Sequence, residues 1–147
     1  MDAKEYLQAM ADFSCKINHE AVRLKRLKET LGSLRSPSFK PNYNTPSFGD
    51  SYHARMTTEI MDKELQLDTA REELELWRND VQTLLMKMEN TDYQLVLGLR
   101  YLDGMNWPKI SECLNASLST VKRWHQKALE EFPAPEQMPD YVQSLVA

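Results

Sequence analysis

Residues 93–132 read YQLVLGLRYLDGMNWPKISECLNASLSTVKRWHQKALEEF, and this stretch carries the clearest structural pattern in the chain. It predicts three short helices, and the last two have the spacing of a helix-turn-helix. Asn115 stands in the turn between them, where the backbone needs a residue that tolerates a positive φ. Ser117 follows, and its hydroxyl oxygen can cap the next helix by accepting from the backbone N–H of Ser119 or Thr120.

The last predicted helix has two unlike faces. Its inward positions recur at steps of three and four and are Val121, Trp124, Ala128 and Phe132. On the preceding helix the inward positions are Ile110, Cys113 and Leu114. The outward face is polar and basic, and residues 117–129 include cations but no acid. Such a helix, entered through a tight turn, fits the major groove of DNA. The predicted DNA-binding residues are Ser117, Leu118, Ser119, Thr120, Lys122, Arg123, Gln126 and Lys127.

Two longer stretches have the apolar spacing of heptads. The first consists of Tyr6, Met10, Phe13, Ile17, Glu20, Leu24, Leu27, Leu31 and Leu34. The second consists of Ile60, Lys63, Leu67, Ala70, Leu74, Trp77, Val81, Leu84 and Met88. These stretches predict two long amphipathic helices at about 2–34 and 52–90, joined by a Pro-rich linker at 35–51. A helix after the second stretch should begin with a capping box at Thr91–Gln94.

The lengths of these helices decide how they pair. At 1.5 Å per residue each would be roughly 50–58 Å long. A parallel pair would stretch the linker close to its limit of about 3.5 Å per residue, whereas an antiparallel pair needs no such stretch. We therefore predict an all-α fold. A long antiparallel, coiled-coil-like hairpin for oligomerisation forms residues 1–90, a three-helix helix-turn-helix domain forms 91–132, and 133–147 form a C-terminal tail.

The composition excludes several other classes of protein. The net charge of −4, with 27% charged and 41% hydrophobic residues, is ordinary, and the basic residues are concentrated locally. No apolar run approaches the about 18 residues of a membrane span, so we expect a cytoplasmic protein that does not bind membranes. The histidines lie on different segments and no Gly-rich phosphate loop is present, so we predict neither an enzyme nor a cofactor.

Two smaller features have a structural and a functional reading. Cys15 and Cys113 lack metal-ligand spacing, so we predict no metal site and expect both to be small buried side chains. The first long helix carries a group of cations, for which a solvated face is favoured over a second DNA contact. Its members are Arg23, Lys25, Arg26 and Lys28.

The residues from 96 to 132 resemble the helix-turn-helix of sigma factor region 4, which reads the promoter −35 element. The resemblance is carried by the run LRYL, the glycine before the second helix, Ile110 with Leu114, and the groups TVKR and KAL. It implies that the recognition helix starts at Ser117. It also implies a set of DNA-facing positions, namely Leu118, Ser119, Thr120, Lys122, Arg123 and Lys127.

The layout as a whole resembles the ArpU-like late-gene transcriptional regulators of phages and prophages. That resemblance implies a sequence-specific transcriptional regulator in the cytoplasm of a bacterial host. Double-stranded DNA is the expected partner, RNA polymerase is a further candidate, and a homo-oligomer, with a dimer favoured, is the expected assembly. The alternative function is a DNA packaging protein similar to the small terminase subunit of phages, for which the hairpin would build a ring.

Overall fold

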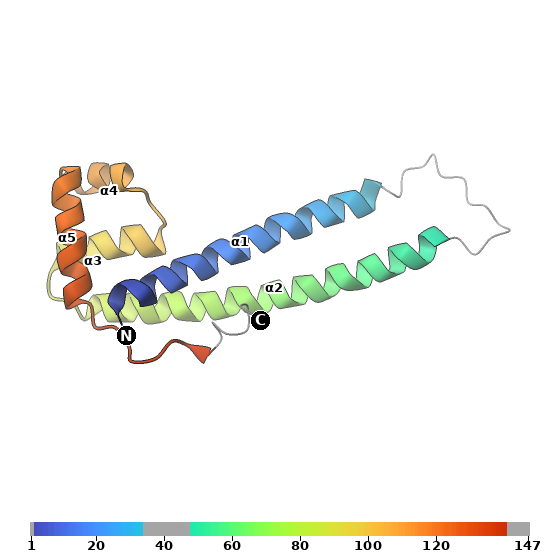
Figure 1. Ribbon diagram of the computed structural model, residues 1–147, viewed down its shortest axis with the longest axis horizontal. Coiled ribbons are helices and arrows are strands. Elements are labelled where there is room, and N and C mark those ends of the chain that lie inside the picture. The colour runs from blue at the N-terminus through green and yellow to red at the C-terminus, as the bar shows by residue number, and fades with distance from the viewer. Residues whose placement is uncertain (1, 34–47, 141–147) are drawn as a thin grey trace. The chain divides into compact units, whose positions relative to one another are not determined.

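The computed structural model describes residues 2–33 and 48–140, and the regular elements in these ranges are all helical (Figure 1). They are α1 (Ala3–Ser33), α2 (Phe48–Met86), α3 (Thr91–Leu97), the π-helical segment η1 (Gly98–Leu102), α4 (Trp107–Leu114) and α5 (Leu118–Glu131). The prediction of an all-α fold is confirmed. The chain divides into two compact units, unit 1 (Met1–Cys15 with Glu73–Ala147) and unit 2 (Lys16–Glu72). Each long helix contributes one part to each unit.

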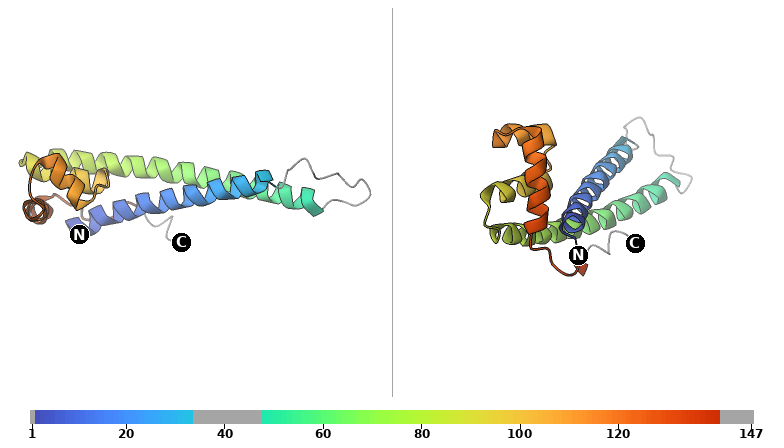
Figure 2. Two further views of the ribbon diagram at one scale, coloured as in Figure 1. Left: turned by 90° about the horizontal axis from the view of Figure 1, so that it is seen from above. Right: turned by 60° about the vertical axis from the view of Figure 1, so that its left-hand side comes forward.

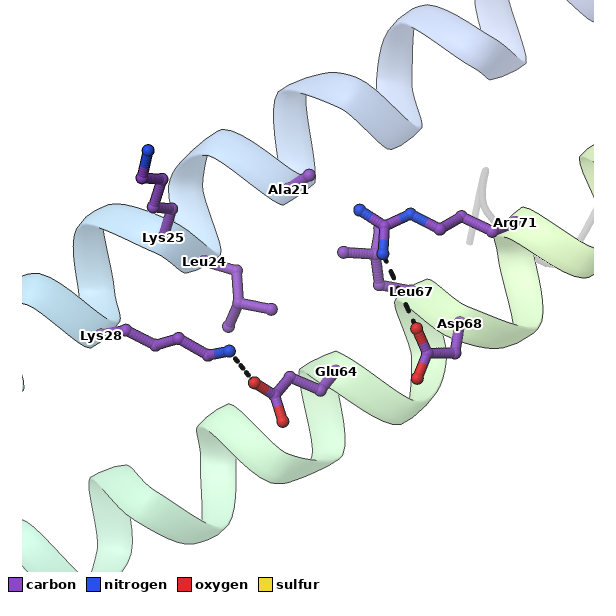
Figure 3. A pocket seen from close by; sticks show the side chains of 8 residues that line it. All are labelled: Ala21, Leu24, Lys25, Lys28, Glu64, Leu67, Asp68 and Arg71. Atoms are coloured by element: carbon purple, nitrogen blue, oxygen red, sulfur yellow. Dashed lines mark ion pairs between the residues drawn. The ribbon is translucent and has the colours of Figure 1, made fainter.

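Unit 2 is a pair of antiparallel helices. Its apolar side chains Leu24 of α1 and Leu67 of α2 are buried. Lys28, four residues after Leu24, forms an ion pair with Glu64, three residues before Leu67 (Figure 3). The two helices therefore run in opposite directions here, as the linker length predicted.

Unit 1 is built around an aromatic cluster. Trp77 of α2 is fully buried, and the rings of Tyr6 and Phe13 from α1 each lie 5.8 Å from its ring, centroid to centroid. Tyr6 also stacks on Phe132, which follows α5, at 6.2 Å. The first part of α1, the last part of α2 and the end of α5 are thus held together by one set of rings, whose burial removes a large apolar area from water.

The first heptad stretch is buried where the sequence predicted a core, within the described residues. Five of its members are buried, Glu20 is exposed, and Leu27 and Leu31 are half-buried. The buried members are Tyr6, Met10, Phe13, Ile17 and Leu24. Leu34 and most of the predicted linker lie outside the described residues.

The second stretch departs from its prediction near its end. Leu85 is buried while Leu84 is only half-buried. In addition, α2 stops at Met86 instead of residue 90, and tighter bonds from the Lys87 and Met88 amides to the Leu84 and Leu85 carbonyls follow. The Leu85 side chain lies beside Gly98. A Cβ added to this glycine would be 3.9 Å from Leu85 Cδ1.

The caps of the short helices are mostly where the sequence placed them. Asn106 accepts from the Lys109 amide at 3.0 Å, with Pro108 in the first turn of α4. Asn115 has a φ of 53°, the left-handed conformation that the turn requires. The predicted capping box at Thr91–Gln94 is wrong, because Asn90 is the cap.

Asn90 takes the cap role with its side-chain oxygen. That oxygen accepts from the amides of Asp92 and Tyr93 at 2.9 and 3.4 Å, so Thr91 is already helical. The Gln94 side chain, which a capping box would direct to the cap amide, donates instead to the carbonyl of Met88. Asn and Thr are both good N-cap residues, and in this structure Asn90, one position before Thr91, is the cap.

Truncating Trp77 should destabilise unit 1 strongly. Trp77→Ala removes the ring that Tyr6 and Phe13 cover, and we expect the free energy of unfolding to fall by about 3–5 kcal/mol. The matched control is Leu76→Ala, because Leu76 is 59% exposed on the same helix and its loss should cost no more than about 0.5 kcal/mol. Urea unfolding followed by circular dichroism measures both, and equal losses would contradict the assignment of the core.

Candidate nucleic-acid interface

Helix α5 packs against α3 and α4 through one apolar face. Val121 and Ala128 of α5 are fully buried, as are Val96 and Leu97 of α3 and Ile110 of α4. Figures 1 and 2 show α5 lying crosswise to both of these helices. With one face fixed in this way, the opposite face of α5 is directed to solvent.

The residues predicted to bind DNA lie together on that outward face. Seven of the eight are exposed, and Thr120 is half-buried. Ser117 is the N-cap of α5, and the other seven belong to the helix itself. The exposed ones are Ser117, Leu118, Ser119, Lys122, Arg123, Gln126 and Lys127.

The cations of this face are available to a ligand. Within the part of the chain that the structure describes, Lys122, Arg123 and Lys127 take part in no ion pair. The nearest acids along the helix are Glu130 and Glu131, in its last turn. A row of unpaired cations on an exposed helix is suited to the phosphates of a nucleic acid.

The start of α5 is organised by three hydroxyl groups. Ser117 Oγ accepts from the Thr120 amide at 3.2 Å, which confirms the predicted cap. The same oxygen is hydrogen-bonded to Thr120 Oγ1 at 2.7 Å and to Ser119 Oγ at 3.2 Å. The cap thereby fixes where α5 begins and ties neighbouring hydroxyls into a local network.

His125 does not belong to the outward face. It is part of a packed cluster with Tyr101, Trp107 and Arg100, which is called the frame below. Its Nε2 is hydrogen-bonded to the Tyr101 hydroxyl at 2.8 Å, and its ring meets the edge of Trp107 at 4.8 Å between centroids. The Arg100 guanidinium lies 4.5 Å from the Trp107 ring centroid and donates to the Met105 carbonyl at 3.3 Å. In the structure the His125 ring is therefore packed between Tyr101 and Trp107.

The frame depends on a π-helical turn that the sequence analysis missed. In η1 the Asp103 amide donates to the Gly98 carbonyl at 3.0 Å, five residues back. Tyr101 lies in this segment, so its hydroxyl is placed opposite His125 by the turn.

Burial keeps His125 uncharged at neutral pH. Loss of solvent lowers its pKa from 6.5 to about 4, and the charges of Arg100 and Lys4 act in the same direction. Burial likewise raises the pKa of Tyr101. The pair is therefore neutral, and the charge that α5 presents comes from its lysines and arginine.

Some predicted roles are corrected by the structure. Cys15 and Cys113 are both exposed, so their expected burial is wrong. Cys113 lies near the end of the short helix α4, beyond the point where α5 covers Ile110, and Leu114 is only half-buried. Trp107 is also half-buried.

Two of the cations on α1 in unit 2 have acidic partners. Lys28 pairs with Glu64, and Arg23 lies 3.4 Å from Glu20. Figure 3 shows Lys28 and Lys25 beside a cleft whose other wall carries Glu64, Asp68 and Arg71. Because acids and bases alternate there, this surface fits the solvated face that the sequence favoured.

The comparisons with known proteins place the chain in one family. Residues 52–133, more than half of the chain, match the model of a family described as "Protein of unknown function (DUF1492)". The chain belongs to this family. No curated protein and no solved structure matches it. The part shared with the DUF1492 family runs from α2 through α5, so it includes the whole outward face described above.

Two other kinds of feature are absent from the described residues. Residues 2–33 and 48–140 contain no group of three or more His, Cys, Asp or Glu side chains that could hold a metal ion. Nor does any helix in these ranges have the length and apolar character needed to cross a membrane.

The neutral state of His125 should make unit 1 less stable in mild acid. Below pH 6.5 His125 binds a proton in the unfolded chain, whereas in the folded chain it stays neutral until about pH 4. The free energy of unfolding should therefore fall as the pH drops through this window. Because the ring is partly exposed to solvent, we expect a loss of about 1–2 kcal/mol.

Variants separate this effect from that of other groups. His125→Gln should flatten the pH dependence of the unfolding free energy between pH 7 and 4.5. His19→Gln removes an exposed histidine and should leave the dependence unchanged. Identical curves for the His125→Gln protein and the unmodified protein would contradict the assignment.

Proposed function

We propose that this chain is a sequence-specific DNA-binding protein that regulates transcription, with α5 as its recognition helix. One observation carries the proposal. The face of α5 opposite its packed side exposes three cations without ion pairs, beyond a tight turn with a left-handed Asn115 and a Ser117 cap. A short, rigidly packed helix with a polar, basic outer face has the size and chemistry that the major groove accepts.

The side chains of this face suit different parts of DNA. Arg123 lies in the second turn of α5, and its planar fork matches the O6 and N7 acceptors of guanine. Gln126 offers both a donor and an acceptor, which matches N6 and N7 of adenine. Lys122 and Lys127 carry compact charges suited to phosphates, which fix register without reading sequence.

The sequence resemblance narrows the proposal. The similarity of residues 96–132 to sigma factor region 4, and of the layout to ArpU-like regulators, supports a role in late-gene control of a phage or prophage. RNA polymerase is then a second candidate partner. We propose no catalytic activity, because the proposed regulation requires only binding.

We also propose that the hairpin brings two copies together, as predicted from the heptads. Supporting this, Met61 and Leu65 in unit 2 are 62% and 68% exposed, and their spacing of four residues places them on one face of α2. Two linked recognition helices would multiply the discrimination that a single α5 can provide. A symmetric dimer would bind inverted half-sites spaced by about 34–36 Å or a multiple of it.

Removal of the cations should separate specificity from affinity. Arg123→Ala should weaken binding to the selected site by about 1–3 kcal/mol and relax preference at one base pair. Lys122→Ala and Lys127→Ala should weaken binding to all DNA sequences alike and flatten the salt dependence of binding. Fluorescence anisotropy over a salt series measures these changes.

The control for this series is Lys16→Ala, which removes an exposed cation from α1. It should leave the specific affinity unchanged. If the triple variant Lys122→Ala, Arg123→Ala, Lys127→Ala keeps its fold by circular dichroism and binds DNA normally, the proposed function is wrong.

A charge on the exposed face of α2 should dissociate the oligomer. Leu65→Asp places a carboxylate where apolar contact with a second copy is proposed, and burying it would be costly. We expect the mass in analytical ultracentrifugation to fall to that of a monomer, with helix content retained. The neighbouring Gln66→Asp, on a different face, is the control. A monomeric unmodified chain would contradict the dimer, and a ring of roughly eight or more copies would favour the packaging alternative.

A further inference from the structure

Leu118 is an unexpected residue on the outward face of α5. It is the first residue of the helix and is 44% exposed. Lys122 follows one turn later, so the leucine and the lysine are neighbours on one face. Leu118 stays partly exposed beside a cation, whereas the fully buried residues of α5 are Val121 and Ala128.

The hydroxyl groups around Leu118 are short and already engaged. Ser117 Oγ is bonded to the Thr120 amide, to Thr120 Oγ1 and to Ser119 Oγ. Thr120 is in addition half-buried. Leu118 is therefore the longest side chain at the start of α5 and the one that extends from it without a hydrogen bond to satisfy.

The first turn of a recognition helix is the part that approaches base edges most closely. Among the groups that bases present in the major groove, the C5 methyl of thymine is the apolar one, and it distinguishes T·A from the other pairs. An exposed leucine at this position is the chemical complement of that methyl group.

We propose that Leu118 reads a thymine, by packing its side chain against the C5 methyl group at the position where α5 first meets the bases. This inference rests on the proposed DNA-binding function and assigns one base preference within it. A protein partner is less favoured because Leu118 is one apolar side chain beside Lys122 and three hydroxyls, a setting that suits a polyanion.

The test uses DNA in which single thymines are replaced by deoxyuridine, a change that removes only the methyl group. The preferred site is first recovered by selection of the full-length protein on random double-stranded DNA. Each thymine of that site is then replaced in turn, and Kd is measured for the unmodified protein, Leu118→Ala and Leu95→Ala. Leu95 is the matched control, because it is 45% exposed and lies on α3.

For the unmodified protein we expect one thymine per half-site whose replacement weakens binding about fourfold, the effect of burying one methyl group. Leu118→Ala should bind the thymine and deoxyuridine sites equally at that position. Leu95→Ala should keep the profile of the unmodified protein. This combination would establish the contact, since the leucine and the methyl group would each matter only when the other is present.

Four results would overturn the proposal. If a site is selected but no replacement of thymine by deoxyuridine weakens binding, the thymine contact is wrong while DNA binding stands. The same holds if the replacement weakens binding of Leu118→Ala as much as it weakens binding of the unmodified protein. If Leu118→Ala keeps the thymine profile but loses binding to bacterial RNA polymerase, the leucine serves a protein contact. If no sequence is selected, the proposed function fails and the inference fails with it.

Discussion

The packing of Tyr6 and Phe13 on Trp77 is the interaction on which the rest of unit 1 depends. Trp77 is the largest fully buried side chain, and Tyr6 extends the cluster by stacking on Phe132 at the end of α5. The ring of Tyr6 thus contacts both Trp77 of α2 and Phe132 at the end of α5. Because α5 ends at this cluster, its C-terminal end is held by the same core that joins α1 to α2.

The N-terminal end of α5 is held by a different device, and the two together fix its rotation. Asn115 in the left-handed conformation and the Ser117 cap determine where the helix starts. Between the ends, the hydrogen bond from Tyr101 to His125 locks one face. A helix turns by about 100° per residue, so a shift of one position would turn either Lys122 or Arg123 away from the outward face. Fixing that rotation is what makes a defined set of side chains available.

Elements set by local chemistry and by periodic spacing could be predicted from the sequence. The cores of the two long helices follow from heptad spacing, and the turn at Asn115 follows from backbone sterics. Features decided by contacts between distant residues could not. Leu85, buried in place of Leu84, lies beside Gly98, and the π-helical turn brings Tyr101 to His125. The eight residues of the candidate site share one surface because a 3.6-residue period describes α5, but their use by DNA stays a proposal.

The part shared with the DUF1492 family includes α2 to α5 but not α1. Within unit 1, however, Trp77 is covered by Tyr6 and Phe13, which both belong to α1. A segment limited to residues 52–133 would expose that indole ring and would lose the stacking partner of Phe132. The position of α5 therefore depends on α1, although none of the residues on its outward face belongs to α1. In physical terms, α1 supplies the apolar side chains that cover Trp77, and the shared segment supplies the exposed cations of α5.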